Sequence, residues 1–180
     1  PLGEEFVKNA PIAEVRALLA SQNLPTDYID VPFTPFLVVA GGRRILMDTG
    51  LGEFGGPTTG KLLENLRAAG VQPGDIDTVL ITHYHGDHIG GLRNKAGEFV
   101  FPKAKVLVPA PEHAFWMDDA KMNAAPDAMK GAFQNVRRVF AQMPSEMLVR
   151  FEPGGEVAPG IRSVAAFGHT PGHTLFQLQS

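Results

Sequence analysis

Apolar side chains recur along the chain at two spacings, one typical of helices and the other typical of buried strands. Apolar residues three or four positions apart predict helices over residues 11–21, 61–69, 111–118 and 128–143. Short β-branched and apolar runs predict strands over residues 36–40, 44–48, 78–82, 105–108, 148–151, 161–166 and 174–178. The Gly41-Gly42 pair between the first two runs is a hairpin signal. This mixture predicts an α/β or α+β layered fold.

The length and composition favour a single domain over residues 1–180. Hydrophobic residues make up 44% of the chain, and a chain of this size buries roughly two-thirds of its surface on folding. The 16 basic residues against 19 acidic residues give a net charge of −3. This balance argues against a nucleic-acid partner, because such binding needs clustered basic charge. No apolar run reaches the ~20 residues of a membrane span, so no membrane partner is expected either.

Cysteine is absent from the chain, which excludes disulfides, cysteine metal ligands and thiol nucleophiles. The beginning of the chain shows no basic segment followed by an apolar one, the pattern of a secretory signal peptide. A chain without cysteine suits oxidising and reducing compartments equally. The sequence therefore leaves the localisation of the protein unknown.

Half of the six histidines stand in one short run, His83-Tyr84-His85-Gly86-Asp87-His88. The run follows the predicted strand 78–82. In an extended segment, residues two apart point to the same side, so His83 and His85 can approach one ion. If the chain then turns, Asp87 and His88 can face a second point nearby. Imidazole and carboxylate groups are suitable zinc ligands, so this run is a candidate metal site.

The non-functional alternative for this run is a surface loop that happens to be rich in histidine. The alternating ligand spacing after a strand speaks against it, as do Gly90 and Gly91, which would let the backbone turn sharply away from the site. Tyr84 lies between two candidate ligands and should point to the opposite side of the segment. We therefore expect Tyr84 to pack in the core.

A second histidine-containing run follows another predicted strand, Gly168-His169-Thr170-Pro171-Gly172-His173-Thr174. If both loops open at the same sheet edge, a histidine from this run can join the pair His83 and His85. Three imidazoles would leave a fourth metal position for water, which is the open arrangement of catalytic zinc sites. The spacing leaves open whether His169 or His173 is the ligand.

Three motifs together resemble the metallo-β-lactamase superfamily. The run from Thr82 to His88 matches its signature, the run from Gly168 to His173 resembles its third-ligand motif, and Asp48-Thr49-Gly50 resembles its upstream turn. Their order and separations fit as well. The resemblance implies a metallo-β-lactamase-like αββα sandwich.

The chain departs from the superfamily pattern at both ends. The superfamily opens with strands ahead of the first helix signal seen here. Its two-metal site also needs a bridging Asp and a last His downstream of the third-ligand motif, whereas this chain has no Asp after Asp127 and no His after His173. We therefore expect the sandwich to be incomplete at both ends, and residues 1–180 to be a fragment of a longer chain.

The resemblance also implies roles for the candidate residues. His83, His85 and His169 would hold a first metal ion, and Asp87 and His88 would belong to a second. Two more residues would support these ligands from outside the metal shell, Asp48 and His173. Zinc is the expected metal, in one or two copies, although imidazole and carboxylate ligands also accept manganese, cobalt or iron.

Within the superfamily, the chain is most similar to the methyl parathion hydrolase branch. The similarity lies in short stretches such as Gly56-Pro57-Thr58, Phe101-Pro102 and Phe115-Trp116. In that branch, aromatic side chains near these places line an apolar pocket. Phe54, Phe115 and Trp116 are therefore candidate pocket residues, with packing in the core as the alternative for each.

These residues predict a metal-dependent hydrolase in which a metal-bound hydroxide cleaves a small ester, lactone, lactam or phosphotriester. If only one metal binds, Asp87 becomes the candidate general base. One alternative is a non-catalytic metal-binding protein of the same fold, and a less favoured one is a metallo-nuclease. The expected partner is a small-molecule substrate. The oligomeric state stays open, with a homodimer among the options.

Overall fold

The computed structural model describes residues 2–4 and 7–179 and divides the chain into two compact units, Pro1–Pro32 and Phe33–Ser180. The smaller unit contains helix α1 (Ile12–Ser21), which begins directly after Pro11. In the same unit, the Leu2 N–H donates a hydrogen bond of 2.8 Å to the Asp27 carbonyl. That both units belong to one domain stays a prediction.

The larger unit contains a five-stranded sheet in the order β1-β2-β3-β4-β5. Its strands are β1 (Phe36–Ala40), β2 (Arg43–Met47), β3 (Thr78–Leu80), β4 (Lys105–Pro109) and β5 (Leu148–Phe151). The first two strands pair antiparallel, and the other pairs are parallel. Gly41 and Gly42 form the predicted hairpin turn, and both have positive φ angles of 55° and 73°, as a type I′ turn requires.

A second, antiparallel sheet is formed by β6 (Glu156–Ala158), β7 (Ile161–Ala165) and β8 (Thr174–Leu178), with β7 in the middle. Ser163 and Phe176 pair across β7 and β8; Ser163 is buried, and Phe176 is partly buried. The next pair along, Val164 and Leu175, is exposed at 39% and 52%. The alternation shows that this sheet has one face in the core and one exposed face.

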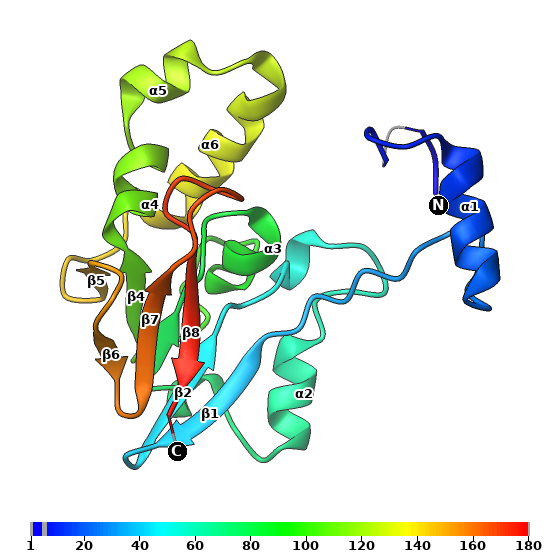
Figure 1. Ribbon diagram of the computed structural model, residues 1–180. Coiled ribbons are helices and arrows are strands. Elements are labelled where there is room, and N and C mark those ends of the chain that lie inside the picture. The colour runs from blue at the N-terminus through cyan, green and yellow to red at the C-terminus, as the bar shows by residue number, and fades with distance from the viewer. Residues whose placement is uncertain (1, 5–6, 180) are drawn as a thin grey trace. The chain divides into compact units, whose positions relative to one another are not determined.

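Helices of the larger unit pack against the five-stranded sheet (Figure 1). They are α2 (Leu62–Ala68), α3 (Gly86–Ile89), α4 (Ala110–Trp116) and α6 (Asp127–Phe140), whereas α5 (Asp119–Ala124) packs on α4 and α6. The larger unit also has single 3₁₀ turns, with η1 (Gly52–Phe54) before α2, η2 (Pro73–Asp75) after α2 and η3 (Gly90–Leu92) after α3. The longest helix, α6, places Phe133, Val136 and Val139 in the core, at the three-residue spacing expected for one helix face.

The central strands are apolar on both faces because each face covers a different layer. Leu46, Val79 and Val106 belong to the core shared with the helices. Their chain neighbours Ile45 and Leu80 pack instead with residues of the second sheet, such as Ile161 and Phe176. A sheet covered on both sides explains why these strands are nearly continuous apolar runs in the sequence.

The larger unit therefore has a helix layer, a mixed sheet and an antiparallel sheet, which are three of the four layers of the αββα sandwich that the sequence predicts. Besides the 3₁₀ turns, the structure contains three elements outside the predicted set, the helices α3 and α5 and the strand β6. Among the residues that the structure describes, none forms a helix that is both long enough and apolar enough to cross a membrane.

Gly90 and Gly91 serve a different purpose from the sharp turn that the sequence suggests. Gly90 has an ordinary helical φ of −59°, and neither residue has a positive φ. They are glycines because another loop lies directly against them. A Cβ atom would stand 2.6 Å from the Leu51 carbonyl oxygen at Gly90, and 2.3 Å from the Thr49 carbonyl oxygen at Gly91. These glycines therefore hold the Asp48–Leu51 turn beside the histidine run.

Replacing Gly91 by alanine is expected to lower the free energy of unfolding by about 1–3 kcal/mol, because the added methyl group must push two backbone segments apart. Urea denaturation followed by circular dichroism measures the change. The matched control is Gly131→Ala in α6, where a Cβ meets open space. The control should raise stability by up to about 1 kcal/mol. Equal effects of the two substitutions would contradict the close packing.

Candidate metal centre

Loops from both sheets meet at one end of the larger unit (Figure 1). The chain leaves β3 in an extended conformation through His83 and His85, and then turns into the short helix α3, which carries Asp87 and His88. From the second sheet, the loop between β7 and β8 brings His169 and His173 to the same place. The Thr174 N–H joins the two loops by donating to the Thr82 carbonyl at 3.0 Å.

His83, His85 and His169 form a nearly regular triangle. Their ring centroids are 4.8, 4.7 and 4.7 Å apart, and one ligand nitrogen from each ring lies within 4.8 Å of the other two. Nε2 of His169 is 3.1 Å from Nε2 of His83. The structure therefore brings together, from two distant loops, the three imidazoles that the resemblance implies as ligands.

This spacing suits a metal ion. Zinc binds imidazole nitrogens at about 2.0–2.1 Å, so two such nitrogens at a tetrahedral angle lie about 3.3 Å apart. The 3.1 Å between the Nε2 atoms of His83 and His169 is close to that value. When no ion is bound, the same distance accommodates an N–H···N hydrogen bond between the two rings.

Burial favours the neutral form of two imidazoles of the triangle, His83 and His85. Burial, followed by the charge that neighbouring imidazoles such as His88 would carry, lowers the pKa of His83 to about 2. Burial also lowers the pKa of His85, and His169 adds to the effect. Both rings are therefore neutral near pH 7, and a neutral imidazole is the form that binds a metal.

Asp87 and His88 lie beside the triangle as a second pair. Nε2 of His88 is 3.4 Å from Oδ2 of Asp87, and the His88 ring centroid is 3.9 Å from that of His83. Burial lowers the pKa of His88, but the hydrogen bond and negative charge of Asp48, together with Asp87, outweigh it and raise the pKa above its usual value. The chain thus has a carboxylate and an imidazole where the sequence predicts a second metal position.

Asp48 anchors the histidine run. Its Oδ1 accepts a hydrogen bond of 2.8 Å from the Thr82 N–H, and its Oδ2 accepts from the Thr82 hydroxyl at 2.8 Å. Oδ2 is also 2.7 Å from Nδ1 of His88. A proton on Nδ1 directs the other nitrogen of His88 toward Asp87, so Asp48 fixes both the orientation and the tautomer of this ring.

His173 lies at the edge of the cluster. Its ring centroid is 4.9 Å from that of His83 and 5.6 Å from that of His169. Its Nδ1 is 3.2 Å from the Ala166 carbonyl oxygen, which it can reach by donating a hydrogen bond across its own loop. This placement favours His169 over His173 as the third ligand, which the spacing in the sequence left open.

Tyr84 points away from the cluster, as its place between His83 and His85 predicts. It is 1% exposed, and its ring stacks on Phe140 with centroids 4.3 Å apart. Its hydroxyl is 2.9 Å from Nδ1 of His113. Burial raises the pKa of Tyr84 well above its usual value, so the phenol stays protonated and belongs to the core.

The three candidate pocket aromatics occupy different environments. Trp116 is 2% exposed and packs on Phe133 in the core, with centroids 4.7 Å apart. Phe115 packs against the same core and is partly buried. Phe54 is 43% exposed, and the guanidinium carbon of Arg138 lies 4.0 Å from its ring centroid. A contact of these aromatics with substrate stays a prediction.

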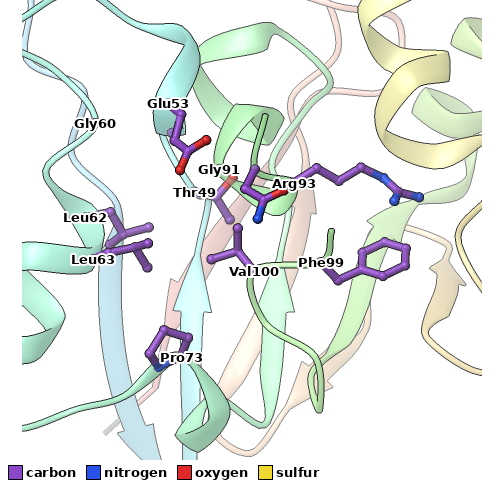
Figure 2. Close-up of a pocket in the computed structure, with 12 residues that line it drawn as sticks. Thr49, Glu53, Gly60, Leu62, Leu63, Pro73, Gly91, Arg93, Phe99 and Val100 are labelled. Atoms are coloured by element: carbon purple, nitrogen blue, oxygen red, sulfur yellow. The ribbon is translucent and has the colours of Figure 1, made fainter. Parts of the chain in front are cut away.

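Figure 2 shows a pocket of about 270 Å³ that is separate from the histidines. Residues of three segments line it, among them Thr49, Glu53, Leu63, Arg93 and Val100. The lining includes none of the predicted metal ligands or candidate pocket aromatics. This pocket is therefore a feature of the fold that the sequence did not reveal.

Two residues that sequence reasoning did not select contact the histidine runs directly. Thr82 links Asp48 to the run and lies within 3.3 Å of His88 Nδ1. Glu112 accepts hydrogen bonds from backbone groups of both runs. Thr82 already stands in the run that resembles the superfamily signature. A glutamate on an otherwise apolar helix face, four residues before a tryptophan, was the available signal for Glu112.

Comparison with known proteins identifies relatives of the chain. Metallo-beta-lactamase domain-containing protein 1 of Rattus norvegicus is 48% identical over 65 residues, which are 36% of this chain and 22% of that protein. The solved hydrolase AbOPH in the beta lactamase superfamily has a TM-score of 0.89 and 28% identity, and the match covers 99% of this chain and 63% of that one.

A second solved structure, AidC, is a dizinc quorum-quenching lactonase in complex with a product. Its TM-score is 0.82 with 29% identity, and the match covers 95% of this chain and 60% of that one. The chain thus spans less than two-thirds of the length of these relatives. Residues 34–180 match the family model of the metallo-beta-lactamase superfamily. Because this match covers nearly the whole larger unit, the chain belongs to the metallo-β-lactamase superfamily.

Proposed function

We propose that the protein is a metal-dependent hydrolase that cleaves small esters or lactones with water activated at the histidine cluster. The observation that carries this proposal is the convergence of His83, His85 and His169, whose ligand nitrogens lie within 4.8 Å of one another. Three imidazoles leave a fourth tetrahedral position open, which is the arrangement of catalytic rather than structural zinc sites.

The residues of the chain have separate roles in the proposed reaction. His83, His85 and His169 would hold a first ion, and Asp87 with His88 would contribute to a second. A bound divalent ion supplies Lewis acidity, which lowers the pKa of water and polarises the bond under attack. The Asp87 side chain is 32% exposed and 3.4 Å from His88, so it can take up a proton as general base when one ion is bound. Zinc is the proposed ion because AidC is a dizinc enzyme.

Two similarities guide the choice of substrate. AidC, at 29% identity, is a lactonase, which favours esters and lactones. The finer resemblance to the methyl parathion hydrolase branch, carried by stretches such as Phe115-Trp116, adds phosphotriesters to the candidates. Lactams complete the set because the superfamily includes enzymes that open them. All of these substrates have an electrophilic centre that an activated water attacks.

The test is to assay the purified, zinc-loaded chain on four substrates, a chromogenic aryl ester, an N-acyl-homoserine lactone, a chromogenic β-lactam and an aryl phosphotriester. We expect turnover of the ester or the lactone that falls to the uncatalysed rate with a chelator and returns when zinc is restored. His83→Ala, prepared in parallel, controls for a contaminating hydrolase and should be inactive.

Two outcomes would contradict the proposal. Turnover that survives chelation would show that the reaction does not need a metal. Zinc binding without turnover of any of the four substrates would favour the alternative of a non-catalytic metal-binding protein with this fold. Activity on the phosphotriester alone would support the hydrolase but move its specificity to the methyl parathion hydrolase branch.

A further inference from the structure

Helix α4 carries a carboxylate that is completely shielded from solvent. Glu112 is 0% exposed, and it lies on a helix whose other buried residue is Trp116. Trp116 stands four positions later on the same helix face, and its indole N–H donates to Oε1 of Glu112 at 2.8 Å. Burying a charge is costly unless its lone pairs find donors, so the partners of this carboxylate indicate why it is there.

The other two partners are backbone N–H groups from the two histidine runs. The Tyr84 N–H, between His83 and His85 in the sequence, donates to Oε1 at 2.9 Å. The Gly172 N–H, next to His173, donates to Oε2 at 2.7 Å. Each carboxylate oxygen therefore binds a different loop. Hydrogen bonds to a charged acceptor are shorter and stronger than neutral ones, so this carboxylate forms a strong bridge between the loops.

Gly172 is shaped to allow this bridge. A Cβ atom at position 172 would lie 2.1 Å from the backbone nitrogen of Glu112 and 2.5 Å from its Cα. The loop between β7 and β8 therefore rests directly on the first turn of α4, and Figure 1 shows the two segments side by side. Only glycine lets the second loop approach closely enough for its N–H to reach the carboxylate.

We propose that Glu112 is a positioning residue that sets the separation of the two histidine-bearing loops. The carboxylate connects the backbone between His83 and His85 to the backbone of Gly172, three residues after His169 in the same loop, so the three imidazoles are placed before an ion arrives. The Thr174–Thr82 backbone hydrogen bond is a second connection between the same loops. It lies where the second loop enters β8, because Thr174 is the first residue of that strand. This inference rests on the proposed function, because the purpose of the spacing is metal binding.

The decisive variant is Glu112→Gln. Its amide oxygen can still accept from both Tyr84 and Trp116, but its NH₂ group then faces the Gly172 N–H, donor against donor. The tie to the second loop is lost while the shape of the side chain is kept. We expect zinc affinity, measured by competition with a chromogenic chelator, to fall by about 10–100-fold, as for other groups that orient metal ligands. The absorption spectrum of the Co(II)-loaded variant should change as well.

The matched control is Val136→Ala, a fully buried core position in α6 without a hydrogen bond to either loop. It loses stability without touching the bridge, so its zinc affinity should stay within about 3-fold of the original. If Glu112→Gln does not fold, Gly172→Ala tests the same tie from the other side, because its methyl group displaces the loop from α4. We expect a loss of zinc affinity in that variant too.

A metal-free readout separates this inference from the proposed function. Amide hydrogen exchange of the apo protein should show Tyr84 and Gly172 protected in the original chain, and Gly172 exchanging much faster in Glu112→Gln. If the original chain binds no zinc but this difference is found, the proposed function fails and the bridge between the loops stands. Unchanged Gly172 exchange, unchanged zinc affinity in Glu112→Gln, or an equal loss of affinity in Val136→Ala would overturn the inference.

Discussion

Replacing His169 by alanine is expected to weaken zinc binding by about 100-fold or more. A complete four-ligand zinc site in a protein is worth roughly 10–16 kcal/mol, so one ligand accounts for about 3 kcal/mol, which corresponds to a factor of about 100. The substitution removes the ring whose Nε2 lies 3.1 Å from that of His83 and leaves a pair of imidazoles that cannot enclose an ion. Isothermal titration or chelator competition measures the affinity, and hydrolysis should disappear with the metal.

Two histidine variants make this test specific. His173→Ala removes the neighbouring imidazole, which contacts the Ala166 carbonyl rather than the centre of the triangle, so its effect should be about tenfold smaller. His113→Gln removes an imidazole that contacts Tyr84 on the core side and should change zinc affinity by less than about 3-fold. A larger loss for His173→Ala than for His169→Ala would exchange the roles of the two residues.

The substitution Asp48→Asn is expected to lower the free energy of unfolding by about 2–4 kcal/mol, since hydrogen bonds to a charged group contribute about 1.5–3 kcal/mol each. Asn keeps one oxygen for the Thr82 N–H, but the NH₂ group in place of Oδ2 accepts a hydrogen bond from neither the Thr82 hydroxyl nor Nδ1 of His88. Asn also tolerates the positive φ of 56° at this position, so the backbone is not strained. Urea denaturation of the metal-free protein measures the change.

The control for this prediction is Asp77→Asn. Asp77 also accepts a hydrogen bond from a backbone N–H, that of Arg44 at 2.8 Å, but at an exposed site. It should cost less than about 1 kcal/mol. A double-mutant cycle with Thr82→Val should be non-additive, because both substitutions remove the same hydrogen bond. Additive effects would show that Asp48 and Thr82 act independently.

The sequence predicted the elements whose pattern is set by burial on a regular face. Residues 148–151 and 174–178 form strands with the predicted bounds, and the predicted helix 128–143 is α6 (Asp127–Phe140). The short helix α5 escaped prediction because none of its residues is buried, so it has no apolar periodicity. β6 has three residues, fewer than the runs that identify a strand.

In the candidate site, too, the sequence predicts the features that follow from a regular spacing and misses those that depend on loops or distant segments. The side of the chain to which His83 and Tyr84 point follows from the two-residue period of an extended segment, and the structure has both as predicted. The choice between His169 and His173 depends on the path of a loop, which the residue spacings of helices and strands do not determine. The role of Gly90 and Gly91 depends on a segment some forty residues away. Glu112 escaped because a glutamate early in a helix ordinarily faces solvent.

The triangle of imidazoles also has a consequence for how the molecule reaches its native state. The contact between His83 and His169 closes a loop of 86 residues, and closing so long a loop carries an entropic cost that local contacts do not repay. The site therefore matures late, when the β7–β8 hairpin docks. An ion bound by all three imidazoles would therefore stabilise the nearly folded protein and slow its unfolding. It would not initiate the early collapse of the chain.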